Sequence, residues 1–159
     1  MPRMNIFEAL RVSHETQRAL SARMLASQAD ERQGIFEELK AELLAHETAE
    51  ERCFYVPLID HDVTVDAARH GIAEHHEMDE MVEDLEELAP DSSQWMDGAR
   101  KLRDKIEHHL SEEESKFFQQ AGKVLTEAQK LSLAKEYEAQ FLTLRVKDAG
   151  AVATPPKDA

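Results

Sequence analysis

The chain has few of the residues that form thiolate sites, tight turns or membrane spans. Cys53 is its single cysteine, which excludes an internal disulfide and a thiolate-rich metal site. Glycine and proline number only five each, and no apolar run approaches the roughly 18 to 20 residues that cross a membrane. With 33% charged and 42% hydrophobic residues, the composition suits a helical protein of one domain.

Positive charge is also scarce, because 19 lysines and arginines face 33 aspartates and glutamates, for a formal net charge of -14. Such an acidic surface repels nucleic acid and anionic membranes, so we expect neither as a partner. The N-terminus enters helical patterning at once and lacks the apolar core of a signal peptide. The expected location is therefore the cytoplasm.

Hydrophobic periodicity predicts an all-α protein of five helices without a convincing strand. The expected helices cover about 5–28, 30–57, 67–88, 93–121 and 126–146, with capping residues at 91–93 and a capping box at Thr126 and Gln129. Four long helices with short connections favour an antiparallel up-down-up-down four-helix bundle.

This reading divides the chain into three parts. Residues 1–124 would form the bundle, and 125–148 would add a C-terminal helix that packs on the bundle or on a partner. Residues 149–159 have no periodicity and are expected to be a disordered tail.

Two segments, which begin at His46 and His109, repeat one pattern: a histidine, a glutamate four residues later, a second glutamate and an aromatic pair. Four residues are about one helical turn, so His46 and Glu50 project from one face, as do His109 and Glu113. Each pair also continues the apolar stripe of its helix, which carries it toward the interior. A single pair would often be an ordinary surface ion pair, but the duplication and the core placement favour a metal site.

Buried carboxylates need a compensating cation, because an unpaired one costs several kcal/mol. His14 and His75 lie on the apolar faces of the first and third helices and would complete a set of four imidazoles. Four imidazoles with two or more carboxylates suit a pair of first-row metals, iron above all. A single zinc ion needs only about four ligands, and calcium and magnesium prefer oxygen alone.

Two other carboxylates are weaker candidates for metal binding. Asp79 lies one turn after His75, and Glu47 follows His46 and could swing in as an extra ligand, although either could be a solvated acid. The second glutamate of each repeat would accept a hydrogen bond or face water. Four further histidines are expected in loops or on polar faces: His61, His70, His76 and His108.

As a set, these motifs resemble the hemerythrin-like family, in its bacterial HHE cation-binding branch. The matching motifs are Ser13-His14, His46-x-x-x-Glu50-Glu51, Glu74-His75-His76-x-x-Asp79 and Glu107-His108-His109-x-x-x-Glu113-Glu114, within about residues 5–124. The resemblance implies a non-haem di-iron site inside a four-helix bundle. It also implies the ligands His14, His46, Glu50, His75, His109 and Glu113.

The resemblance has one clear departure. Oxygen-carrying hemerythrins have two histidines four residues apart on the third helix, whereas here Gly71 precedes His75 by four and Asp79 follows it by four. The site would then be poorer in nitrogen and richer in oxygen, which favours redox reactivity or sensing over stable O2 carriage.

We therefore expect two iron ions and an open coordination position for a small ligand. Family members bind O2 or related ligands, sense oxygen, iron or nitric oxide (NO), or handle peroxide, so O2, NO and peroxide are the expected partners. Three alternatives stay open: a regulatory protein whose fifth helix, homodimer or protein partner reads metal occupancy, a peroxide-decomposing, catalase-like enzyme, and a structural bundle with a mononuclear or zinc site.

Overall fold

The computed structural model describes residues 3–153, and from residue 148 onward only the backbone. Within this range the elements are all helices and there is no strand, which confirms the all-α class. None of the helices in this part of the chain is long and apolar enough to cross a membrane.

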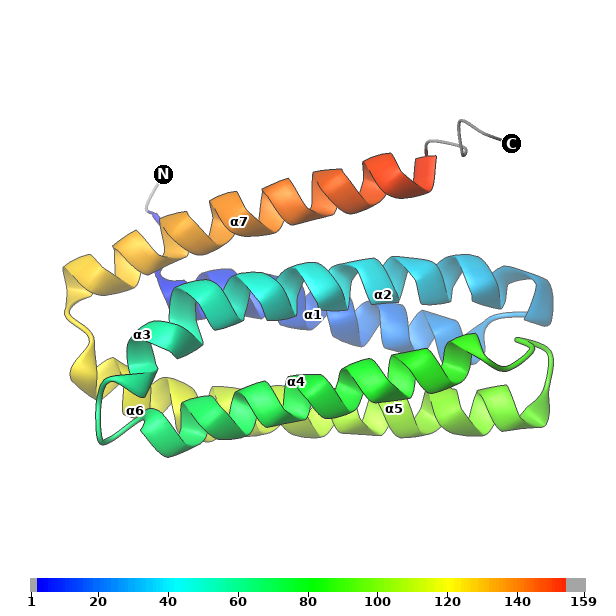
Figure 1. Cartoon of the computed structure of the whole chain (residues 1–159), viewed down its shortest axis with the longest axis horizontal. Helices are drawn as coiled ribbons and strands as arrows, with labels where there is room; N and C mark the ends of the chain where they lie inside the picture. The colour runs from blue at the N-terminus through cyan, green and yellow to red at the C-terminus, as the bar shows by residue number, and fades with distance from the viewer. Residues whose placement is uncertain (1–2, 154–159) are drawn as a thin grey trace.

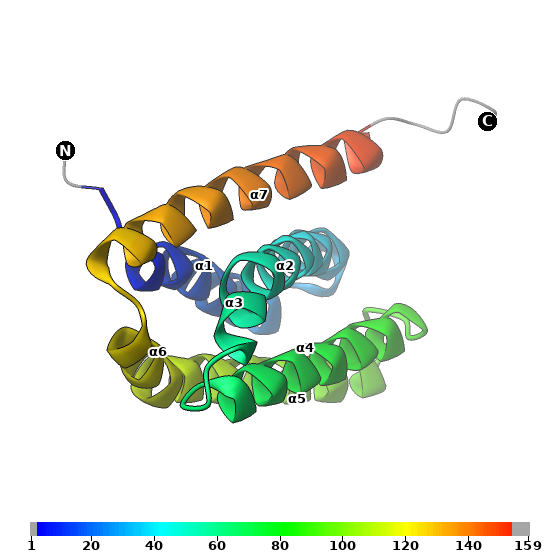
Figure 2. The same ribbon diagram turned by 60° about the vertical axis from the view of Figure 1, so that its left-hand side comes forward.

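Nine helical elements follow one another along the described chain. They are α1 (Ile6–Ala26), α2 (Ala29–Glu50), the π-helical turn η1 (Glu51–Tyr55), α3 (Val56–Ile59), α4 (Val65–Glu86), α5 (Ser93–Glu112), the π-helical turn η2 (Glu113–Phe117), α6 (Phe118–Val124) and α7 (Glu127–Ala153). The long helices α1, α2, α4 and α5 lie lengthwise alongside one another (Figure 1). Helix α7 packs on α1 and α2, on the side away from α4 and α5 (Figure 2).

Side-chain caps begin two of these helices where the sequence predicts them. The Ser92 hydroxyl accepts a hydrogen bond from the Trp95 amide at 3.1 Å and so caps α5. Before α7, the Thr126 and Gln129 side chains each accept a hydrogen bond from the other residue's amide, at 3.1 and 2.8 Å. Both devices satisfy amides that the first turn of a helix leaves free.

The helix ends differ from the predicted ones in three places. The second predicted helix is interrupted by η1 and continues to Ile59, and the fourth is interrupted by η2 and continues to Val124. Gly122, expected to break the fourth helix, lies inside α6. Helix α7 reaches Ala153, so the first part of the predicted tail is helical, while 154–159 lie outside the described residues.

A layer of buried polar side chains divides the apolar core in two. One apolar cluster, with Leu10 and Phe54, surrounds the end near α3 and α6, and the other, with Leu39 and Trp95, surrounds the opposite end. In α1, α2 and α4 a buried histidine lies between residues of the two clusters, and on α5 His109 lies where one cluster ends, before the other begins at Phe117 in η2. The fold therefore places a polar centre at mid-height, where the side chains are buried between the two apolar clusters.

Candidate metal centre

The six side chains that the sequence singles out as ligands converge in this layer. Their donor atoms form two groups, each within 4.8 Å, and every one of the six residues is at most 3% exposed. The first group contains His14, His46, Glu50 and Glu113, and the second contains Glu50, His75 and His109. Because Glu50 belongs to both groups, the two groups of donors adjoin each other.

Glu50 lies between the two groups and faces a histidine from each. Its Oε1 is 3.4 Å from His46 Nε2 and 3.2 Å from His75 Nε2. The nearby imidazoles outweigh the effect of burial, which alone would raise the pKa of Glu50, and hold it well below its ordinary value. An ionised carboxylate in this position can bridge two cations.

Glu113, the first residue of η2, also faces a histidine from each group. Its Oε1 is 3.1 Å from His14 Nε2, its Oε2 is 3.8 Å from His109 Nε2, and Oε2 also accepts a hydrogen bond from the Tyr55 hydroxyl. Burial and the nearby Glu50 carboxylate raise the pKa of Glu113. Tyr55 is a residue of the centre that the repeat does not identify, because the sequence shows it only as part of an aromatic pair.

The donor atoms suit metal ions because most of them accept no hydrogen bond within the described structure. The Nε2 atoms of all four histidines, both carboxylate oxygens of Glu50 and Oε1 of Glu113 are buried and without a hydrogen-bond partner among the described residues. Each buried polar atom left in this state costs about 1–3 kcal/mol. A set of such atoms aimed at one another is stabilised when a pair of cations accepts their lone pairs.

In two of the histidines, Nδ1 is held by the second glutamate of a repeat. The Nδ1 of His14 lies 2.7 Å from Glu114 Oε2, and the Nδ1 of His75 lies 3.1 Å from Glu51 Oε2. A carboxylate accepts the Nδ1 proton and so leaves the lone pair on Nε2, the form that a metal needs. Both glutamates belong to or adjoin the π-helical turns, elements that are frequent at functional sites.

The other two histidines show where the internal repeat is broken. The Nδ1 of His109 lies 2.9 Å from Glu74 Oε1, but the Nδ1 of His46 lies 2.8 Å from the hydroxyl of Tyr137 on α7. Ser13 precedes His14 as Glu74 precedes His75, and its short side chain binds Glu42 instead, at 2.7 Å. Helix α7 thus supplies the partner that α1 lacks.

The weaker candidates, Glu47 and Asp79, join neither group of converging donors. Glu47 is buried next to Asp79, and burial raises its pKa well above the ordinary value, which disfavours its charged form. Asp79 is only partly buried. Both lie beside the centre rather than in it.

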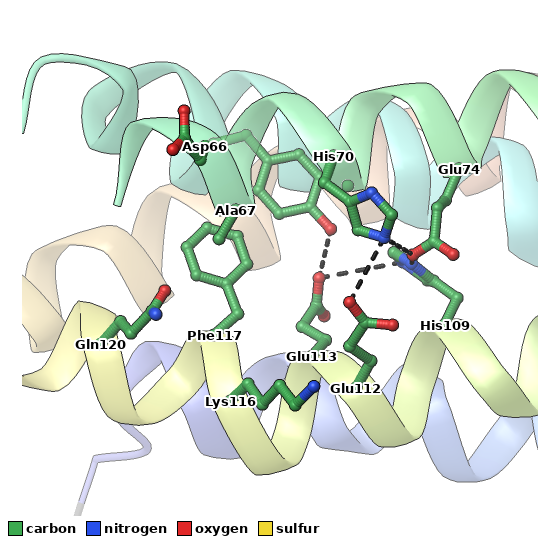
Figure 3. A pocket seen from close by; sticks show the side chains of 12 residues that line it. Asp66, Ala67, His70, Glu74, His109, Glu112, Glu113, Lys116, Phe117 and Gln120 are labelled. Carbon is green, nitrogen blue, oxygen red and sulfur yellow. Dashed lines mark hydrogen bonds and ion pairs between the residues drawn. The ribbon is translucent and has the colours of Figure 1, made fainter. Parts of the chain in front are cut away.

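A cavity of about 270 Å³ reaches the second group from outside, between α4 and the α5–η2 segment (Figure 3). Tyr55, Gly71, His109 and Glu113 contribute to its lining. A Cβ atom on Gly71 would lie only 2.6 Å from the Tyr55 ring, so the absence of a side chain there makes room for the phenol. The space next to Gly71 is therefore filled by the Tyr55 ring.

Comparisons with known proteins agree with this geometry. The family model described as "Hemerythrin HHE cation binding domain" matches residues 5–121. The fold is similar to the crystal structure of a hemerythrin HHE cation-binding domain-containing protein from Mycobacterium kansasii, with a TM-score of 0.85, 21% identity, and coverage of 95% of this chain and 93% of that one. No curated protein matches the chain.

Replacement of Tyr137 by phenylalanine tests the role of α7 at the centre. The variant keeps the ring but removes the hydroxyl that holds His46, so we expect metal affinity to fall roughly 10- to 100-fold. Competition with a chromogenic chelator measures this affinity. Glu136→Gln, on the neighbouring exposed position of α7, is the matched control, and an unchanged affinity in Tyr137→Phe would contradict the role.

Metal binding should release protons. Burial lowers the pKa of His14, but the adjacent carboxylates of Glu113 and Glu114 outweigh it and raise that pKa to about 9, while the pKa of Glu113 is also raised. This coupled pair therefore holds at least one proton at pH 7 in the metal-free protein and must lose it to bind a cation, so affinity should increase as the pH rises toward about 9.

A pH-indicator dye in weak buffer measures this release when Co²⁺ is added at pH 7. Mg²⁺, which prefers oxygen ligands, is the control and should release few protons. Equal release by the two ions, or none with Co²⁺, would contradict the assignment.

Proposed function

Because the chain belongs to the hemerythrin HHE cation-binding family, we propose that it is a non-haem di-iron protein that binds O2, NO or peroxide. The proposal includes the family architecture, in which α1, α2, α4 and α5 form an antiparallel four-helix bundle and α7 is added to it. The observation that carries the proposal is the set of buried, unpartnered imidazole and carboxylate atoms at mid-height.

The two groups of donors would hold one ion each. His14 and His46 would bind the first ion with Glu50 and Glu113, and His75 and His109 would bind the second, with Glu50 shared between the ions. The choice of iron rests on the donor types, since imidazole and carboxylate without thiolate suit first-row metals of this kind.

The second position has fewer converging donors and adjoins the cavity, so we place the small ligand there. The cavity reaches His109 and Glu113, and its volume of about 270 Å³ far exceeds the needs of a diatomic molecule or peroxide. The first position has four donors and is covered on its other side by α7 through Tyr137. Access from solvent is therefore expected from one side only.

When bound, a reduced iron pair supplies electrons to the small ligand. The chain's own residues bury the site and control the proton at its edge. The Tyr55 hydroxyl donates a hydrogen bond to Glu113 next to the cavity, and burial and the neighbouring carboxylates raise the pKa of Tyr55 well above its ordinary value. Tyr55 therefore stays protonated, and its single donor holds Glu113 beside the ligand position.

The test is the metal content per chain of protein purified from iron-supplemented cells, with an optical spectrum recorded in air. We expect about two irons and ligand-to-iron charge-transfer absorption in the wild type, as two adjoining donor groups require. Glu50→Ala should lose most of both, because Glu50 is shared by the two groups. Asp79→Asn, which joins neither group, is the control and should keep both ions.

No iron, or a single tightly held zinc ion, would contradict the di-iron proposal and favour the structural alternative. If iron is present, addition of O2, NO and hydrogen peroxide in separate experiments identifies the ligand. Steady peroxide turnover that is absent in Glu50→Ala would assign the protein to the peroxide-decomposing alternative.

A second candidate function is regulatory, and the contact between Tyr137 and His46 favours it. Because a residue of α7 holds an imidazole of the centre, a change in metal occupancy alters the groups that bind α7 to α1 and α2. The melting temperature or the oligomeric state should then differ between metal-free and metal-bound protein, as scanning calorimetry and light scattering would show. Identical values in both forms would contradict this function.

A further inference from the structure

The geometry points to a further metal site outside the buried centre, formed by His70, Glu74 and Glu112 at the mouth of the cavity. This mouth site would take up a divalent first-row ion on its way to the buried centre. This inference rests on the proposed function, because it concerns the loading of that centre. It also gives a role to His70, which the sequence places among the surface histidines.

The three side chains meet from two neighbouring helices. His70 Nε2 on α4 is 3.3 Å from Glu74 Oε1 and 3.3 Å from Glu112 Oε1 on α5 (Figure 3). Their donor atoms all lie within 4.8 Å of one another. One imidazole nitrogen and two carboxylate oxygens at this separation can share a single cation, and the donor mixture suits a first-row ion better than calcium or magnesium.

The remaining oxygens of the two carboxylates are already held by other groups. Glu74 Oε2 accepts from Lys105 at 3.2 Å, and Glu112 Oε2 lies 3.0 Å from His108 Nε2. Each carboxylate is thus oriented so that its Oε1 faces His70. The ligand set is ordered by its neighbours before any cation arrives, which reduces the entropy lost on binding.

The site lies on the route to the centre rather than elsewhere on the surface. All three residues line the cavity that also reaches His109 and Glu113, whose buried Nε2 and Oε1 atoms have no partner among the described residues. Glu74 connects the two sites directly, since its Oε1 is also 2.9 Å from Nδ1 of His109. An ion at the mouth is therefore held by a carboxylate that touches a ligand of the centre.

A site at the mouth would lower the barrier that dehydration of the ion sets to its entry into the centre. The six inner donors are at most 3% exposed, and a hydrated dication cannot enter such a layer without losing most of its water. The side chains of His70 and Glu112 are 54% and 30% exposed, so they meet the ion while it still carries water. Replacement of water by three protein donors at the mouth divides the dehydration into steps.

The experiment follows Co²⁺ uptake by metal-free, full-length protein in a stopped-flow spectrometer, at a Co²⁺ concentration below saturation. In the double variant His70→Gln/Glu112→Gln we expect uptake to slow roughly tenfold or more, in the range by which charged clefts accelerate ion capture. The final Co²⁺ content should remain about two per chain, because neither residue belongs to the inner donor groups. Both substitutions are at accessible positions and keep the side-chain size.

The matched control is His76→Gln/Glu80→Gln. This pair also lies on α4, with His76 Nε2 2.9 Å from Glu80 Oε1, but it does not line the cavity. Wild-type uptake in the mouth variant, or equal slowing in the control, would overturn the inference while the centre still fills. Failure of the wild type to bind Co²⁺ at all would overturn the proposed function itself, so the two failures are distinguishable.

Discussion

The structure depends on one constraint: a layer of imidazole and carboxylate groups is buried across the middle of a helical core. Such groups are costly in an apolar interior unless their lone pairs and charges are used. The outer nitrogens, Nδ1, are satisfied by Glu114, Glu51, Glu74 and Tyr137, while the inner atoms face one another unpartnered. This division into satisfied outer atoms and free inner atoms is the arrangement that a metal pair requires, and the two apolar clusters on either side hold it in place.

The two halves of the internal repeat differ, and the differences give the centre two unlike sides. In the first half, Ser13 is too short to take the role of Glu74, and α7 covers the site with Tyr137. In the second half, Gly71 makes room for the Tyr55 phenol, and a cavity reaches the donors from solvent. A closed side linked to an added helix and an open side linked to solvent would separate the proposed regulatory contact from the proposed ligand access within one centre.

The same asymmetry relates the proposals to one another. Ligand access and metal entry would both use the open side, where exposed His70 and half-buried Glu112 lie at the mouth of the cavity that reaches buried His109 and Glu113. Glu74 takes part in both, because one of its oxygens faces His70 and Nδ1 of His109. A regulatory function would instead act through α7, on the opposite side of the centre.

The sequence by itself determined the features that depend on local spacing. The helical class, the caps at Ser92 and Thr126, and the one-turn separation of His46 from Glu50 follow from periodicity within single helices, and the structure brings the six candidate ligands together. Only the tertiary structure decided which groups surround them. Tyr137 meets His46 across 91 positions of the chain, a contact that no helical period encodes, and the π-helical turns and the cavity depend likewise on how distant segments pack.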